Sequence, residues 1–199
     1  MRSLGRVLIV MVIVSLVVFV SRAGGPSQAL SASFTAEAAP QIKMYLRVDG
    51  IGGELTDDLH KGCLEVRTYE HVPYIWGDPH ITEGGKEDDL RAGRLTVTKP
   101  VGSATPALLL QYCKQTPIRT VTLELWREGG PVPQKVMVYT HHDCAMNAIR
   151  NMKSAAADDP PLEELNFVFS RTEWVHTEYD ANGKPKGETR AQWDGRATK

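Results

Sequence analysis

The sequence predicts a mainly β domain in which two antiparallel sheets close into a β-barrel, with one short α-helix beside it. About seven segments between residues 42 and 193 alternate apolar and polar side chains, which is the period-2 pattern of half-buried strands. One short stretch has a helix start signal and helix-forming residues, and glycine-rich turns separate the other segments. Residues 42–199 are enough for one hydrophobic core.

The first two strands are expected at residues 42–48 and 64–69. In the first, four apolar side chains share one face: Ile42, Met44, Leu46 and Val48. Residues 49–54 between the two strands are rich in glycine, but no P-loop lysine and no helix follow, so a turn is favoured over a phosphate-binding loop.

Residues 71–92 form a connection that is unusually long for a compact domain, with two prolines, three glycines and an acidic run. Connections of this length are usually functional. The alternative is that residues 71–92 are a surface loop that contacts no partner.

A strand, a helix and a second strand are expected within residues 93–130. Residues 94–99 alternate, and Thr105 followed by Pro106 predicts an N-cap with proline at the first helical position. Pro117 prevents the helix from continuing beyond about Gln115. Alternation returns over residues 118–127, with Val121, Leu123 and Leu125 on one face, before a glycine turn.

The rest of the chain predicts three further strands. Residues 135–139 alternate and end in a polar stretch at 140–144, while residues 146–159 are expected to form a helical turn or a loop. A long strand is expected over residues 165–179, and residues 180–183 carry a hairpin signal before a return strand at 184–193.

The first 23 residues are expected to be a signal peptide or a membrane anchor. Arg2 and Arg6 precede a 14-residue apolar run, residues 7–20. At about 1.5 Å per residue the run spans roughly 21 Å, short of the roughly 30 Å hydrocarbon core, which favours a signal peptide cleaved after Ala23 or, further on, after Ala38. Residues 24–41, rich in alanine, serine and glycine, predict a flexible linker.

Composition and net charge indicate a globular protein and argue against one class of partner. The chain has 199 residues, 42% hydrophobic and 24% charged, which is typical of a globular protein. Three of its 23 basic side chains and none of its 24 acidic ones precede residue 23, so residues 23–199 carry a net charge of −4. An acidic body argues against nucleic acid as a main partner.

No catalytic or metal-binding motif stands out. The sequence has no G-x-S-x-G elbow, no H-E-x-x-H and no Walker loop, so no enzyme activity and no cofactor are expected. A Cys-His enzyme is the weaker alternative. A zinc site would have to be drawn from residues without a C-x-x-C pair: His60, Cys63, His141, His142 and Cys144. Because His141 and His142 are adjacent, they should point to opposite faces of a strand. Whether Cys63, Cys113 and Cys144 include a disulfide stays open.

The central stretch resembles the Hcp family, the haemolysin-coregulated proteins that form the inner tube of the bacterial type VI secretion machine. The resemblance rests on TVTKPVGSATPALLLQYC, residues 96–113, followed by TVTLELWREGG, residues 120–130. In that family a strand ending in Thr-Lys leads into a short helix opened by Ser/Thr-Pro, then into a long strand closed by a glycine turn. A final strand with a tryptophan is matched here by Trp193, and the likeness covers residues 42–199.

The resemblance implies a structural subunit that forms homo-hexameric rings. Stacked rings would make an exported conduit that can carry effector proteins and that meets other type VI components. The long connection would reach from one ring to the next, which makes its aromatic, charged and polar residues the candidate assembly loop: Tyr74, Ile75, Trp76, Asp78, His80, Glu87, Asp88 and Asp89.

The leader supports an alternative, because tube subunits of the family normally lack one. The alternative is a stand-alone Hcp-like binding module or effector adaptor in the cell envelope. It would be secreted or periplasmic after cleavage, or held at the inner membrane through residues 7–20. A misassigned start is a third account, although Met44 lies far into the first strand.

Overall fold

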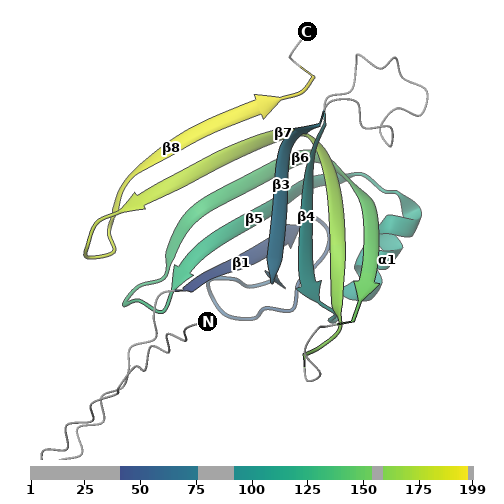
Figure 1. The fold of residues 1–199 in the computed structure, drawn as a ribbon, viewed down its shortest axis with the longest axis horizontal. Coiled ribbons are helices and arrows are strands. Elements are labelled where there is room, and N and C mark those ends of the chain that lie inside the picture. The colour runs from purple at the N-terminus through teal and green to yellow at the C-terminus, as the bar shows by residue number, and fades with distance from the viewer. Residues whose placement is uncertain (1–40, 76–91, 154–158, 197–199) are drawn as a thin grey trace, which may run out of the picture. The chain divides into compact units, whose positions relative to one another are not determined.

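The computed structural model describes residues 41–75, 92–153 and 159–196 as eight strands and one helix (Figure 1). In chain order they are β1 Gln41–Val48, β2 Leu64–Val66, β3 Thr68–Ile75, β4 Ala92–Pro100, α1 Thr105–Lys114, β5 Ile118–Glu128, β6 Gln134–Met152, β7 Leu162–Tyr179 and β8 Pro185–Asp194. A mainly β domain with one short helix is therefore confirmed.

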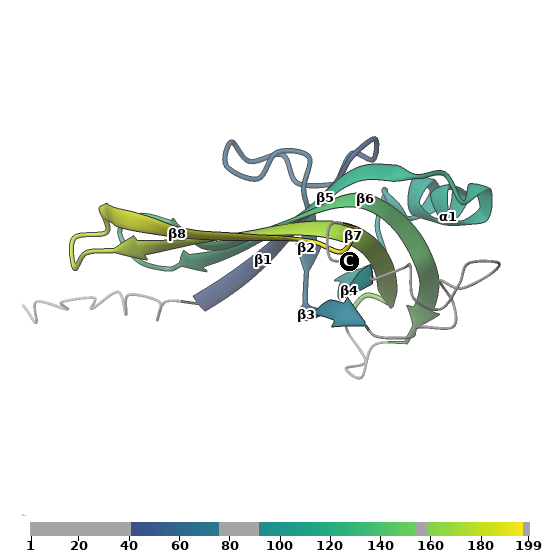
Figure 2. The ribbon, with the colours of Figure 1, turned by 90° about the horizontal axis from the view of Figure 1, so that it is seen from above.

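The strands form one sheet rather than two. Their order is β2-β1-β5-β6-β7-β4-β3, with β8 also paired to β7, and every pairing is antiparallel. β2 and β3 lie at opposite ends of this order, yet only Arg67 separates them in the chain, and its N–H donates to the carbonyl of Thr98 at 2.7 Å. The segment expected as a single strand at 64–69 thus divides between both ends of a curled sheet (Figure 2).

A flat extension, which we call the wing, continues from the curled part. β7 pairs with β4 through residues 162–169 and with β8 through residues 171–179, while β6 pairs with its other side through residues 162–176. The wing consists of β8, residues 171–179 of β7, the first half of β6, the end of β5 and the start of β1 (Figure 2).

The alternation of buried and exposed side chains is interrupted where the wing meets the curled part. On β5, β6 and β7 the buried residues are three apart instead of two: Ile118 and Val121, His141 and Cys144, Phe169 and Thr172. These residues lie at one level of the sheet. Asp143 between them on β6 has a φ of +51°, in the left-handed region that aspartate tolerates better than most residues. The pairing register is the same on both sides of Asp143, so the strands change phase here without losing their partners.

The core fills the curled part of the sheet. Sixteen buried residues form it, contributed by all strands except β3 and β8, with Leu108 from α1. Gly93 on β4 faces this core without a side chain, because a Cβ there would lie 2.3 Å from the ring of Phe169. A larger residue at Gly93 would displace that ring.

Two segments differ from the sequence-based expectation. β3 continues to Ile75 through Pro73, so the long connection begins later than residue 71. β6 runs to Met152, so the predicted polar strand end and the predicted helical turn or loop up to that residue belong to one strand.

The helix begins at the predicted position, but no side chain caps its N-terminus. Thr105 is its first residue rather than its cap, and Ala104 in the N-cap position makes no side-chain bond. The hydroxyl of Thr105 donates to Glu163 Oε1 at 3.0 Å, and Lys99 Nζ donates to the same oxygen at 2.8 Å. Lys99 and Glu163 are fully buried, so this pair ties the start of α1 to β4 and β7.

Candidate assembly surface

The candidate assembly loop leaves the sheet between β3 and β4. Tyr74 and Ile75 are the last residues of β3, whereas Trp76, Asp78, His80, Glu87, Asp88 and Asp89 lie outside the described residues. Ile75 pairs with Ala92, which brings the two ends of the loop together at the end of the strand order. The loop therefore starts and ends on one narrow hairpin.

A cluster of rings supports this hairpin from inside. His71 of β3 lies with its ring centroid 5.1 Å from His141, 4.9 Å from Tyr139 and 5.7 Å from Phe169. His141 stacks on Phe169 at 4.0 Å, and Trp174 meets His71 edge-on at 6.2 Å. Rings from β3, β6 and β7 thus hold the base of the loop.

Burial keeps the two histidines of this cluster neutral. It lowers the pKa of His71 to about 4. Burial, with smaller contributions from His71 and His142, lowers the pKa of His141 to about 3. Neither ring nitrogen of His141, nor Nε2 of His71, has a hydrogen-bond partner among the described residues. A proton on either ring would be a costly charge.

A second cluster fastens residues 49–63 to the other face of the sheet. His60 stacks on Tyr45 with centroids 3.7 Å apart and meets Trp126 edge-on at 4.9 Å. Its Nδ1 lies 2.8 Å from Asp57 Oδ1. The hydroxyl of Tyr45 donates to Glu128 at 2.6 Å. In the sequence, His60 stood out only as one of the residues from which a zinc site could be drawn. In the structure it holds a surface loop against the sheet.

The described residues contain no group of three or more His, Cys, Asp or Glu that could hold a metal ion. His141 is buried, and the adjacent His142 lies on the opposite face, 3.0 Å from Glu173, as predicted for neighbours on a strand. No disulfide forms, since all three cysteines carry free thiols: Cys63 and Cys144 are buried and Cys113 is exposed.

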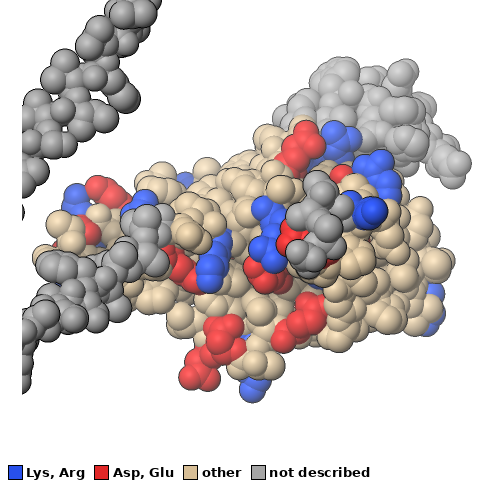
Figure 3. Space-filling view, turned by 60° about the horizontal axis from the view of Figure 1, so that its bottom comes forward, with Lys and Arg blue, Asp and Glu red and all other residues tan. Residues whose placement is uncertain are grey.

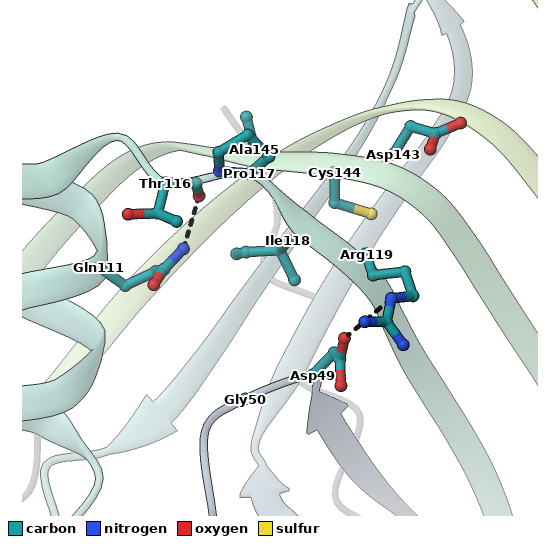
Figure 4. A pocket seen from close by; sticks show the side chains of 10 residues that line it. All are labelled: Asp49, Gly50, Gln111, Thr116, Pro117, Ile118, Arg119, Asp143, Cys144 and Ala145. Carbon is teal, nitrogen blue, oxygen red and sulfur yellow. Dashed lines mark hydrogen bonds and ion pairs between the residues drawn. The ribbon is translucent and has the colours of Figure 1, made fainter.

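A cleft of about 620 Å³ opens between the end of α1, the start of β5 and residues 143–145 of β6 (Figure 4). Arg119 and Asp49 lie on its rim with 3.7 Å between their charged groups. Cys144 also lines the cleft and would be a candidate nucleophile, but burial raises the pKa of its thiol to about 12. Such a thiol stays protonated and is a poor nucleophile.

The outer surface of α1 carries several exposed apolar side chains. Leu108 is buried, but Leu109 and Leu110 are exposed, together with Ala107 and Cys113. Of the three consecutive leucines, only Leu108 faces the sheet. By contrast, acidic and basic side chains are interspersed on the face of the domain in Figure 3, which fits the small net charge.

The fold and the central motif agree with a known family. The family described as "Type VI secretion system effector, Hcp" matches residues 45–176, which is more than half of the chain. The chain belongs to the Hcp family. Hcp proteins are structural secretion proteins that assemble into rings, and they are not known as enzymes.

Solved Hcp structures share the fold. Hcp1 from Salmonella typhimurium is 22% identical with a TM-score of 0.60, over 79% of this chain and 97% of that one. A type six secretion system protein is also 22% identical with a TM-score of 0.63, over 77% and 96%. A type VI secretion system effector from Yersinia pestis is 18% identical with a TM-score of 0.56, over 76% and 98%. No curated protein matches.

The one helix of the described residues has ten residues, so nothing in that part of the chain is a helix long and apolar enough to cross a membrane.

Proposed function

We propose that this Hcp protein is a tube subunit: it forms homo-hexameric rings that stack into an exported conduit and can carry effector proteins. The match to the Hcp family over residues 45–176 carries the proposal. The candidate assembly loop, whose base is held by the ring cluster of His71 and His141, makes the contact from one ring to the next.

The physical requirement for such a ring is a pair of different surfaces on each copy. A closed ring uses heterologous contacts, in which one surface meets another rather than itself. The domain is elongated by its wing, and the wing and α1 lie at its two ends (Figure 1), so each copy has separate surfaces to offer.

Sedimentation velocity over a hundredfold range of concentration tests ring formation. We expect a species of about six chains, and electron microscopy of the same sample should show rings. A protein that stays monomeric over the whole range would contradict the proposal. Removing residues 78–89 and closing the gap with a short glycine linker should leave rings intact but abolish their stacking.

The leader supports a second function, a stand-alone Hcp-like binding module in the cell envelope. Its apolar run, residues 7–20, would direct export or tether the domain to the inner membrane. Mass spectrometry of the N-terminus in fractionated cells separates the accounts. Cleavage after Ala23 in the periplasm or medium, or an intact Met1 in the membrane fraction, favours the envelope module, and a cytoplasmic chain starting downstream favours the tube.

A further inference from the structure

We propose that the exposed face of α1 on one copy docks on the free end of the wing of the next copy, and that this is the contact which joins subunits side by side. The proposal rests on the proposed ring assembly and identifies the two surfaces that such a ring needs.

The first surface is the outer face of α1. Leu109 and Leu110 lie three and four residues after Pro106, and Cys113 lies four and three residues after them, which places the four on one side of a helix. Leu109 is 37% exposed and Leu110 is 54% exposed. The first turn has no acidic residue, and the last turn contributes one lysine, Lys114. A surface helix normally shows charged and polar side chains on such a face.

The second surface is the free end of the wing. Ile42, at the start of β1, is 52% exposed, and Val132, in the turn between β5 and β6, is 53% exposed. Val132 lies next to the turn between β7 and β8, where its Cβ is 3.9 Å from the position that a Cβ on Gly183 would take. The free end of the wing thus carries two exposed apolar side chains, one at the start of β1 and one in a turn beside the β7–β8 turn.

The two surfaces belong to different parts of the domain. Seven large apolar side chains are exposed among the described residues, and four of them lie on these two surfaces. Both ribbon views place α1 and the turns of the wing at opposite ends (Figures 1 and 2). Two apolar surfaces at opposite ends favour head-to-tail contact between identical copies, because each can cover the other without the same patch meeting itself.

Cross-linking tests this contact, since Cys113 is the only exposed thiol of the chain. The chain is expressed from its full-length sequence and purified in its mature form, carrying Val132→Cys or, separately, Ile42→Cys. Oxidation or a short bismaleimide should then give a ladder that extends beyond dimers, because head-to-tail contacts link each copy to two others. Arg67→Cys, an exposed position that belongs to neither surface, is the control and should give no ladder.

A matched pair of substitutions tests the contact without cross-linking. Leu110→Lys should raise the concentration of half-assembly by at least about tenfold, since it places a charge in the buried centre of the contact. Leu59→Lys is the control, because Leu59 is 53% exposed but belongs to neither surface. Both variants should unfold at the wild-type temperature, as neither side chain is in the core.

Several outcomes would overturn the proposed contact. Rings that assemble equally well with Leu110→Lys, or that give no ladder with either new cysteine, would exclude it while leaving ring formation intact. Dimers linked through Cys113 alone in the wild type would show that helices meet each other instead. A wild-type protein that remains monomeric would remove the proposed function, and this contact with it.

Discussion

Lowering the pH from 7.5 to 5 should weaken the fold through His71 and His141. Both have a lower pKa in the folded protein than the usual 6.5, about 4 and about 3 respectively. Below pH 6.5, therefore, these two histidines bind protons in the unfolded chain but remain neutral in the folded protein until the pH approaches 4 and 3. Their contribution to stability is complete above pH 6.5 and is lost progressively as the pH falls towards 4 and 3.

The size of the effect follows from the interval between 6.5 and 5. Over these roughly 1.5 pH units, at about 1.4 kcal/mol per unit, each histidine loses about 2 kcal/mol of its contribution to the free energy of unfolding. His71 is only partly buried, so its share is smaller, and we expect a total loss of about 3 to 4 kcal/mol. This is a large part of the roughly 5–15 kcal/mol that stabilises a typical domain.

Urea unfolding at pH 7.5, 6.5, 5.5 and 5.0, followed by tryptophan fluorescence, measures this loss. The substitution His141→Phe keeps a ring on Phe169 and removes one titrating group, so its loss of unfolding free energy should be about 2 kcal/mol smaller than that of the wild type. His142→Phe, on the opposite face, keeps both buried rings, so it should lose more unfolding free energy over this pH range than His141→Phe does. A wild-type stability that is flat from pH 7.5 to 5, or an equal slope in His141→Phe, would refute the reasoning.

Three further substitutions or treatments have expected outcomes. Lys99→Met leaves the buried carboxylate of Glu163 unpaired and should cost about 3 to 5 kcal/mol in urea unfolding, whereas the double variant Lys99→Met/Glu163→Leu should recover most of it. Gly93→Ala should cost about 1 to 3 kcal/mol because its methyl group meets an aromatic ring, while Gly187→Ala, with open space around it, should change the free energy by less than about 0.5 kcal/mol in the same assay. A chromogenic disulfide reagent should modify Cys113 alone in the native protein and two further thiols after unfolding, and rapid reaction of all three thiols in the native protein would contradict the burial of the other two.

The strands with clean alternation could be predicted from the sequence, because the pattern is local. β1, β4, β5 and β7 lie where their alternating residues placed them, and the turn before β8 is the expected hairpin. β6 was expected to end near Tyr139. The reason is the left-handed backbone at Asp143, which leaves the buried residues His141 and Cys144 three positions apart and interrupts the period on which such predictions depend.

Other features depend on contacts between distant residues. β3 reaches Ile75 although it contains Pro73, which is compatible with a strand at the end of the order and with the register shift between Val72 and Ile75. Thr105 was expected to cap α1, but its hydroxyl bonds to Glu163, 58 residues away. Which of three consecutive leucines is buried is decided by the sheet beneath the helix.

The ring cluster below the assembly loop had no signal in the sequence. His71 was placed in a connection and His141 at a strand end, and 70 positions separate them. Only the register of β6 against β7, and the curl that brings β3 over them, puts the rings in contact. The candidate loop residues, by contrast, come from the length and composition of residues 71–92 together with the resemblance to the Hcp family, and they stay a prediction.

The length of β6 and β7 has a mechanical consequence. These two strands run side by side from the wing to the curled part, paired from Met137 with His176 to Met152 with Leu162. A force that pulls on the free end of the wing acts along the strands, so it must shear many hydrogen bonds at once rather than open them one by one. The register of this pair is the same on both sides of Asp143, where the backbone is left-handed, so the wing and the core would carry a load as one unit.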